Sequence, residues 1–265
     1  MSVFLQTLSH ILKMNLNHDA KGEFASGPGG VAMELETPGW KQISEKKGSN
    51  PGGLHEAPDG THTYVKFYAN PDQARTEVAS SKVFEAMEVP TAKPRIETVN
   101  GKTALVTQWN DQLQQLKPGD FSKLNMKQSA TAAKAYVAAV LTKNWDVVGL
   151  EHDNLVLDKT TGNLMEVDTG GSFKYRAQGE SKPFGADIDE ATSLMNTKFP
   201  AGQVFDHIAK NQPLAMKAAY KALKSMDIDK VVDRIAASGI KDGAEIATNV
   251  IKRRNSMLDE MSKYA

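Results

Sequence analysis

The two halves of the chain differ in hydrophobic pattern, and this change most constrains the fold. Strand-like patterns lie before residue 110. The segment "TYVKFYA" (63–69) is rich in β-branched and aromatic residues and follows the turn signal "PDG", which predicts a strand entered through a hairpin. The segment "RIETVNGKTALVTQW" (95–109) predicts two further strands around the Asn100-Gly101 turn. A small sheet is therefore expected in this half.

One helix is expected within the strand-rich half. The segment "NPDQARTEVASSKVFEAM" (70–87) begins with the N-cap candidate Asn70, and Pro71 follows at the first helical position. Gln73 stands where a capping-box partner would be. We therefore predict a helix directly after the first hairpin.

Helix dominates after residue 120. The segment "NMKQSATAAKAYVAAVLTKNW" (125–145) is alanine-rich, which predicts a long helix. The segment "NLVLDKTTGNLMEVD" (154–168) predicts a hairpin with a five-residue loop. Amphipathic helices are expected from residue 187 onward, broken near Pro200, Pro213 and 239–243. The pattern predicts an α+β fold with two lobes.

Composition excludes several classes of protein. The 265 residues carry 32 Lys and Arg and 32 Asp and Glu, so the net charge of zero argues against direct nucleic-acid or anionic-membrane binding. There is no cysteine, which excludes disulfides, thiolate metal sites and cysteine nucleophiles. No apolar run reaches the ~20 residues that cross a bilayer, and the N-terminus does not resemble a signal peptide.

The N-terminal segment differs from the rest of the chain. Residues 3–15 predict a short amphipathic helix, and residues 17–40 carry seven glycines and prolines in a polar stretch. We expect a partly flexible arm over residues 1–45, followed by a small lobe over 46–110 and a larger lobe over 111–265.

Two features of the small lobe suit phosphate binding. The turn "GSNPGG" contains Gly48, Ser49, Asn50, Gly52 and Gly53, and its exposed amides could cradle phosphate, although a plain hairpin turn also explains it. Lys66 lies in the middle of a predicted strand, on the same face as Tyr64 and Tyr68. It either faces solvent or points into a cleft, where it could hold a phosphate.

Glu77 is the candidate partner of that lysine. Spacing of 3.6 residues places it with Ala74, Val78 and Phe84 on the more apolar face of the predicted helix. A carboxylate that points inward needs a partner, because an unpaired buried charge is expensive. Lys66 is the cation one element earlier, and the alternative is a surface glutamate.

Four oxygen-bearing side chains follow in the second half. Asp146, Asp153 and Asn154 precede the predicted hairpin, and Asp168 follows it. Because a hairpin returns its second strand beside its first, Asn154 and Asp168 could face one cavity. Carboxylate and amide oxygens suit Mg²⁺, which also bridges substrate phosphates. Any one of these residues alone could equally be a turn or cap residue.

The order of these parts matches that of protein kinases, namely a glycine turn, a strand lysine, a helix glutamate, an aspartate–asparagine loop and an Asp-x-Gly. The segments "GSNPGG", "YVKFY", "NPDQARTEV", "NWDVVGLEHDNLVL" and "VDTGGSF" resemble atypical protein-kinase-like proteins, especially phage-encoded ones. The chain is also similar to HipA-like and CotH-like kinases and to effector kinases of bacterial pathogens. The resemblance implies a minimal two-lobed protein-kinase-like fold, with a small β-rich lobe carrying one helix and a larger, mainly helical lobe.

The resemblance also implies roles for individual residues. The turn 48–53 would cover the phosphates of ATP, and Lys66 would contact them and pair with Glu77. The segment 106–109, which contains Gln108 and Trp109, would be the hinge that contacts adenine. Asn154 and Asp168 would hold Mg²⁺.

The catalytic aspartate stays open between two residues. In ordinary protein kinases it lies five residues before the metal-binding asparagine, and Gly149 occupies that position here. The CotH-like pattern favours Asp146 as the base, whereas an effector-kinase reading of the loop favours Asp153.

Three functions are compatible with these patterns. The first is ATP- and Mg²⁺-dependent phosphoryl transfer to Ser or Thr of a host or partner protein, in a host cytoplasm or a virion. The second is a virion-associated structural or interaction protein that keeps the fold without the reaction and contacts other phage virion proteins. The third is transfer of AMP instead of phosphate.

Overall fold

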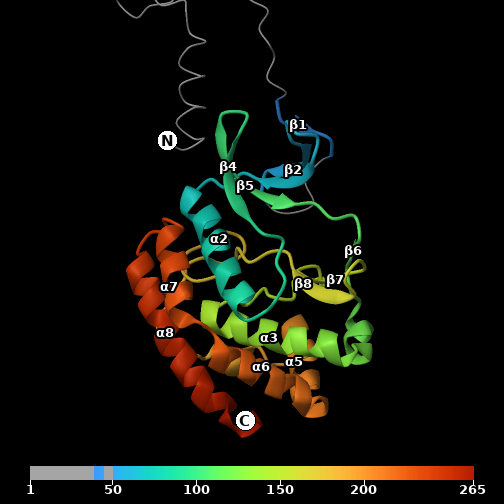
Figure 1. Ribbon diagram of the computed structural model, residues 1–265, viewed down its shortest axis with the longest axis vertical. Helices are drawn as coiled ribbons and strands as arrows, with labels where there is room; N and C mark the ends of the chain where they lie inside the picture. The colour runs from blue at the N-terminus through green and yellow to red at the C-terminus, as the bar shows by residue number, and fades with distance from the viewer. Residues whose placement is uncertain (1–38, 45–49) are drawn as a thin grey trace, which may run out of the picture. The chain divides into compact units, whose positions relative to one another are not determined.

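The computed structural model describes residues 39–44 and 50–265 (Figure 1). The helix expected at residues 3–15, most of the expected arm, and Gly48 and Ser49 of the glycine turn lie outside the described residues. Within the described part, a small antiparallel sheet and a larger helical lobe are distinct, as the sequence predicts.

The small lobe is a five-stranded antiparallel sheet in the order β1-β2-β3-β5-β4. Its strands are β1 (Lys41–Gln42), β2 (Gly52–Glu56), β3 (His62–Lys66), β4 (Arg95–Val99) and β5 (Lys102–Gln108). Asn100 and Gly101 form the expected β4–β5 turn with φ angles of 50° and 75°, which are the positive values that such two-residue turns require.

The two faces of this sheet differ in character. Val65, Val99, Ala104 and Val106 form a small separate core on one face. Lys66 and Tyr64 alternate with Val65 along β3, so their side chains lie on the other face. The register pairs Lys66 with Gly52 on one side and with Leu105 on the other. Strand alternation therefore directs the lysine away from the small core.

Helix α2 (Pro71–Ala86) follows the first hairpin as expected. The Asn70 side chain caps it by accepting a hydrogen bond from the Asp72 amide at 3.0 Å, and Pro71 is its first residue. Gln73 does not complete a capping box; its side-chain amide lies beside Gly179 instead. The Gln73 side chain therefore makes a tertiary contact instead of the capping contact that the local sequence pattern predicts.

The large lobe contains helices and a three-stranded sheet in the order β6-β7-β8. The strands are β6 (Leu113–Gln114), β7 (Leu155–Asp158) and β8 (Asn163–Glu166). The helices are η1 (Pro118–Lys123), α3 (Met126–Thr142), α4 (Glu190–Ser193), α5 (Pro200–Asn211), α6 (Pro213–Ser225), α7 (Ile228–Ala237), α8 (Gly243–Glu260) and η2 (Met261–Tyr264).

Helix α3 lies at the centre of this lobe, with α2, α5, α6 and α8 packed around it (Figure 1). Its many alanines let neighbouring helices approach closely, and most of its side chains are buried. One large core includes α3, the C-terminal helices and the inner residues of α2, among them Val83 and Phe84. By packing, α2 therefore belongs to the core of the large lobe.

Some local predictions differ from the structure. The β7–β8 loop is Lys159–Gly162, because Asn163 already pairs with Asp158 and the expected five-residue loop loses one residue to the strand. Pro200 and Pro213 begin α5 and α6 as expected. A further break comes before α7, where the Asp227 side chain caps the helix by accepting from the Lys230 amide.

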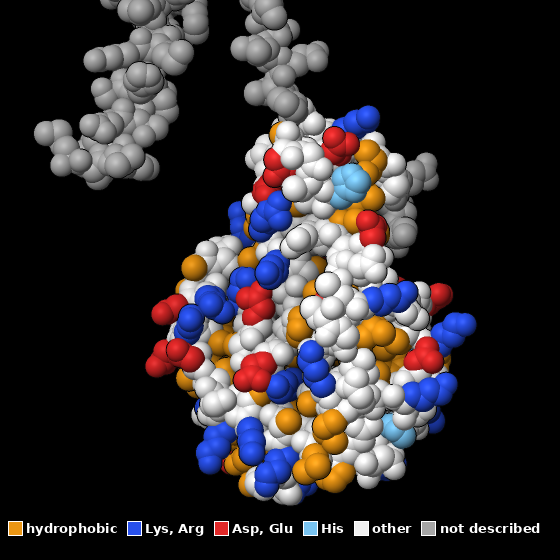
Figure 2. All heavy atoms as spheres, turned by 45° about the vertical axis from the view of Figure 1, so that its right-hand side comes forward, with side chains coloured by type: hydrophobic (Ala, Val, Ile, Leu, Met, Phe, Trp, Pro, Cys, Tyr) orange, Lys and Arg blue, Asp and Glu red, His pale blue; other side chains and the backbone are white. Residues whose placement is uncertain are grey.

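The described surface mixes charges of both signs. Basic and acidic side chains alternate over the face seen in Figure 2, in keeping with the zero net charge of the chain. In the described part of the chain, no helix is long and apolar enough to cross a membrane.

A buried arginine connects three segments of the helical lobe. Arg253 on α8 is fully buried and donates hydrogen bonds to the carbonyl oxygens of Val140, Gly185 and Asp187. It also forms an ion pair with the buried carboxylate of Glu190. Three segments distant in sequence thus meet at one guanidinium group, whose planar fork of donors suits several acceptors at once.

Substitution Arg253→Leu is expected to lower the free energy of unfolding by about 3–5 kcal/mol, because it leaves a buried carboxylate without its main partner. Urea unfolding followed by circular dichroism measures this change. Lys252→Leu, at an exposed neighbouring position of α8, is the control and should change stability little. A loss below about 1 kcal/mol in Arg253→Leu would contradict this account of the lobe.

Candidate active site

A cleft of about 450 Å³ is lined by six of the predicted site residues. It receives side chains from β3, from the loop after α3 and from the segment after β8. Its lining includes Asn50, Tyr64, Lys66, Asp146, Leu150, Asp153, Asn154 and Asp168. The structure therefore brings together residues that lie up to 118 positions apart, from Asn50 to Asp168, as the sequence predicts.

Lys66 is the central charge of the cleft. Its Nζ atom lies 2.8 Å from Oδ2 of Asp168 and 3.1 Å from Oε1 of Glu77. Glu77 is buried, whereas the Asp168 side chain is 40% exposed toward the cleft. The expected pairing of Lys66 with Glu77 is thus present in the structure, and Asp168 completes a cluster of one cation and two carboxylates.

The environment sets the charges in this cluster. Burial acts to lower the pKa of Lys66, but the carboxylates of Asp168 and Glu77 outweigh it and hold this pKa well above its usual range. Burial acts to raise the pKa of Asp168, and the Lys66 ammonium outweighs it, so that this pKa lies below its ordinary value. For Glu77, burial dominates and raises the pKa to about 7. Lys66 and Asp168 are therefore charged at neutral pH.

Helix α2 is fixed to the segment that carries Asp168. The Tyr68 hydroxyl donates to Glu77 Oε2 at 2.6 Å. The Thr169 hydroxyl donates to the Glu77 carbonyl at 2.9 Å, and the Ser80 hydroxyl donates to the Thr169 carbonyl at 2.9 Å. These contacts hold the glutamate in place. Sequence analysis missed Thr169 and Ser80, because neither stands in a recognisable pattern.

Gly170 lets the chain pass close to this cluster. A Cβ atom at this position would lie 3.1 Å from both Asp168 Oδ1 and Glu77 Oε2, and 3.0 Å from the Tyr68 hydroxyl. The Gly170 amide donates to Asp168 Oδ1 at 2.9 Å, which orients the carboxylate. The chain passes so close to the side chains of Tyr68, Asp168 and Glu77 that glycine is favoured at position 170 for this reason as well as for the turn.

The loop after α3 places Asp146 beside Asn154. Asn144 Oδ1 accepts a hydrogen bond from the Asp146 amide at 2.9 Å. The Asn154 Nδ2 group donates to the Asp146 carbonyl at 2.7 Å and to its carboxylate at 3.3 Å. Burial, together with the charges of Asp168 and Asp153, raises the pKa of Asp146 to about 6. A carboxyl group with this pKa can accept a proton near neutral pH.

Asp153 also lines the cleft but is exposed. Gly149, five residues before Asn154, has a φ angle of 78° and no space for a side chain. A Cβ atom there would lie 2.0 Å from Asp153 Oδ1 and 3.1 Å from the Asn154 amide. The loop conformation therefore requires glycine at position 149, which excludes a catalytic side chain there.

The donor set is compatible with Mg²⁺. The Asn154 amide nitrogen is used by Asp146, which leaves its oxygen as the group that can act as a ligand. Among the described residues, no three His, Cys, Asp or Glu side chains form a ready metal cage. Mg²⁺ usually takes only one or two carboxylates and completes its shell with water and substrate phosphates, so Asn154 and Asp168 fit this ion.

Glu166, two residues before Asp168, is a buried carboxyl group that sequence analysis missed. Neither of its carboxyl oxygens has a hydrogen-bond partner among the described residues. Burial, with the negative charges of Asp168 and Asp146, holds its pKa well above the usual range. The environment of Glu166 therefore favours the neutral form of this carboxyl group.

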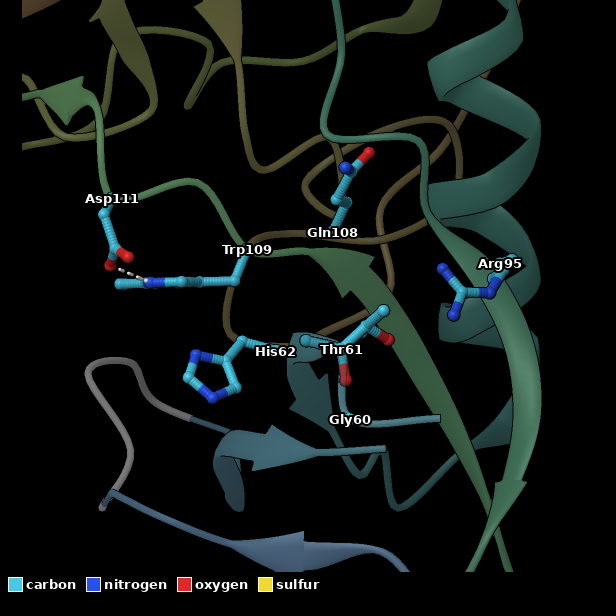
Figure 3. Close-up of a pocket in the computed structure, with 8 residues that line it drawn as sticks. Gly60, Thr61, His62, Arg95, Gln108, Trp109 and Asp111 are labelled. Atoms are coloured by element: carbon cyan, nitrogen blue, oxygen red, sulfur yellow. Dashed lines mark hydrogen bonds between the residues drawn. The ribbon is translucent and has the colours of Figure 1, made fainter. Parts of the chain in front are cut away.

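Two residues of the predicted hinge line a second pocket. Gln108 and Trp109 line a separate pocket of about 470 Å³ together with His62, Arg95 and Asp111 (Figure 3). The Trp109 indole donates to Asp111 and its ring stacks on Tyr64, with centroids 6.3 Å apart. Tyr64 lines the cleft, so Trp109 reaches the cleft only through Tyr64. Of the glycine turn, Asn50 lines the cleft, whereas Gly52 and Gly53 are the first residues of β2.

No model of a known protein family matches the chain, and no curated protein matches it. Solved structures do match, and the one with a TM-score above 0.5 shows that the chain has a protein-kinase-like fold. One is the proinflammatory kinase CtkA of Helicobacter pylori, with a TM-score of 0.54 and 11% identity over 85% of this chain and 95% of that chain. Another is the PknI kinase domain of Mycobacterium tuberculosis, with a TM-score of 0.35 and 12% identity over 87% of this chain and 100% of that chain.

Substitution Asp146→Asn is expected to stabilise the protein above pH 6. Because folding raises the pKa of Asp146 from 3.8 to about 6, ionisation of the carboxyl group at neutral pH opposes folding. The free energy of unfolding should increase by on the order of 2 kcal/mol at pH 8, and this increase should disappear as the pH falls toward 4. Thermal unfolding in the presence of a chelator measures it.

Asp153→Asn, at an exposed position of the same loop, is the matched control and should stabilise the protein much less at pH 8, because its charge is only one of the smaller causes of the raised pKa of Asp146. A melting temperature of Asp146→Asn that is equal to or below that of the wild type at pH 8 would show that the buried environment of Asp146 is assigned wrongly.

Proposed function

We propose that the protein is a kinase that transfers the γ-phosphoryl group of ATP to a Ser or Thr hydroxyl of another protein. The observation that carries this proposal is the cluster in which Lys66 contacts both Glu77 and Asp168, in a cleft that also contains Asp146, Asp153 and Asn154. Phosphoryl transfer needs positive charge on the phosphates, oxygen ligands for a metal and a group that orients the hydroxyl. This cleft has candidates for all three.

Lys66 binds the phosphates in this proposal. Its ammonium group is held toward the cleft by two carboxylates, so little reorganisation is needed when ATP arrives. In this proposal the turn 48–53 covers the phosphates, and of its described residues Asn50 lies on the cleft wall. Residues 106–109 and Tyr64 contact the base. The stacking of Trp109 on Tyr64 supports a role for this pair in holding the base.

Asn154 and Asp168 hold Mg²⁺. When bound, this ion neutralises charge on the β- and γ-phosphates. The protein supplies one carboxylate and one amide oxygen and keeps both fixed, through the Gly170 amide on Asp168 and the Asp146 contacts of Asn154.

Asp146 orients the hydroxyl and accepts its proton. The hydroxyl oxygen forms a bond to the γ-phosphorus, the bond from that phosphorus to the bridging oxygen of ADP breaks, and the proton passes to the Asp146 carboxylate. Asp146 is preferred to Asp153 because hydrogen bonds from Asn154 hold it in place, whereas Asp153 is exposed. Asp153 is the alternative base.

The setting of the reaction is proposed from the motif resemblance. It is that of a phage or bacterial effector protein which acts on a host or partner protein, in the host cytoplasm or a virion. Two alternatives use the same fold, namely a virion-associated interaction protein without activity and an enzyme that transfers AMP. The intact Lys66–Glu77–Asp168 cluster favours phosphoryl transfer over an inactive protein.

Incubation with γ-labelled ATP, Mg²⁺ and a lysate is expected to label protein, and Lys66→Met or Asp168→Asn should reduce the labelling at least 100-fold. Lys82→Met, on the outer part of α2, is the matched lysine control and should keep the activity of the wild type. Label from α-labelled ATP instead would indicate AMP transfer. No label from either nucleotide, with folded protein, would refute the proposed activity.

Asp146→Asn is expected to reduce the transfer rate by 10²–10⁴-fold, the usual contribution of a general base. Asp153→Asn should reduce it less than tenfold, because this side chain would only adjust the charge of the cleft. Single-turnover kinetics at saturating ATP measure both effects. The reverse ranking would assign the base to Asp153.

A further inference from the structure

A second cavity, of about 560 Å³, lies on the large lobe beside the candidate base. Its wall is formed by the loop after α3, the segment after β8 and the region from α4 to the start of α5. Asp146 and Leu150 line both this cavity and the Lys66 cleft. A chain bound here would therefore lie next to the site where a phosphoryl group would be transferred.

Large exposed apolar side chains meet in this cavity. Leu150 is 74% exposed, Phe199 is 58% exposed and Trp145 is 40% exposed. Phe199 comes from a segment about 50 positions away from the other two, so the tertiary fold brings it to them. Isolated apolar side chains on a surface are ordinary, but a group that shares one cavity marks a binding site.

Both basic and acidic side chains line the cavity. Lys143 and Glu190 are buried and lie 3.4 Å apart, and Glu190 also pairs with the buried Arg253. Arg176 is half-exposed, with its guanidinium group 5.1 Å from the centroid of the Trp145 ring. Its ion pair with the exposed Glu180 is long, at 3.8 Å, and surface pairs of this kind contribute little. Arg176 is thus available to a carboxylate, and the acidic groups of the lining that reach solvent are exposed Asp189 and half-buried Asp146.

We propose that this cavity, defined by Trp145, Leu150, Phe199 and Arg176 and called the substrate groove below, selects the protein substrate. Its occupant is an extended segment in which a large apolar side chain flanks the Ser or Thr acceptor. That side chain covers Leu150 and Phe199, and an acidic residue of the same segment contacts Arg176. This proposal rests on the proposed function, since it places the acceptor hydroxyl at Asp146.

The test is a library of peptides with one fixed Ser or Thr and varied flanking positions, assayed with ATP and Mg²⁺. The wild type should select Leu, Phe or Met at one flanking position and Asp or Glu at another. Phe199→Ser should raise KM for the selected peptide about tenfold and change kcat less than twofold, a split that a general loss of structure would not give. Leu214→Ser, an exposed leucine on α6 outside the groove, is the matched control.

Arg176→Glu gives a second, independent readout. It should replace the preference for an acidic residue by a preference for Lys or Arg, which is a gain that misfolding cannot produce. Lys210→Glu, an exposed charge on α5, is its control and should keep the acidic preference. Selection that survives both groove variants, or transfer without any flanking preference, would overturn the proposal.

Binding of the same labelled peptides, followed by fluorescence polarisation without nucleotide, separates the two proposals. If apolar–acidic peptides bind the wild type and bind Phe199→Ser about tenfold more weakly, the groove stands even where no phosphate is transferred. If phosphate is transferred but no such peptide preference exists, the proposed function is supported and the proposal that the substrate groove selects the substrate is refuted. A wild-type dimer that Phe199→Ser converts to a monomer would make the groove a contact between copies and overturn the proposal.

Discussion

The geometry of the cleft depends on one half-buried ammonium group, that of Lys66. Lys66 comes from β3, Glu77 from α2 and Asp168 from the segment after β8, and their charged atoms meet within 3.1 Å of the lysine nitrogen. Removal of Lys66 would leave two neighbouring carboxylates without their cation in a partly buried site, which is expensive. The cluster therefore specifies how the sheet, the helix and the large lobe are placed relative to one another.

Helix α2 is the connection between the two cores. Its sequence follows the first hairpin, yet Val83, Phe84 and Met87 pack in the large core with α3 and the C-terminal helices. The Asp72 carboxylate also accepts hydrogen bonds from the Lys241 amide at 2.7 Å and from the Tyr175 hydroxyl at 3.0 Å. The position of Glu77 is consequently set by the large lobe, and Lys66 on the sheet meets it there.

Two carboxyl groups of the cleft region lower the stability of the folded protein at neutral pH. Asp146 and Glu77 have raised pKa values because they are buried near other carboxylates, so their ionised forms oppose folding at neutral pH. Packing in the two cores offsets this loss. Such groups concentrate at functional sites, and here they lie beside a second cavity that shares Asp146.

The sequence by itself determined the local elements and named Lys66, Glu77 and Asp168 as candidates, but it left open whether the lysine faces a cleft and whether the glutamate points inward. Alternation directs Lys66 away from the apolar face of β3, 3.6-residue spacing places Glu77 on the more apolar face of its helix, and a hairpin returns Asp168 beside Asn154. These are short-range consequences of backbone geometry, so one sequence suffices to predict them. The tertiary structure decided what depends on long-range packing, namely the place of Gln108 and Trp109 outside the cleft and the burial of Glu166 and Arg253. Phe199 likewise meets Leu150 only because the fold brings them together, and no pattern within either segment encodes that contact.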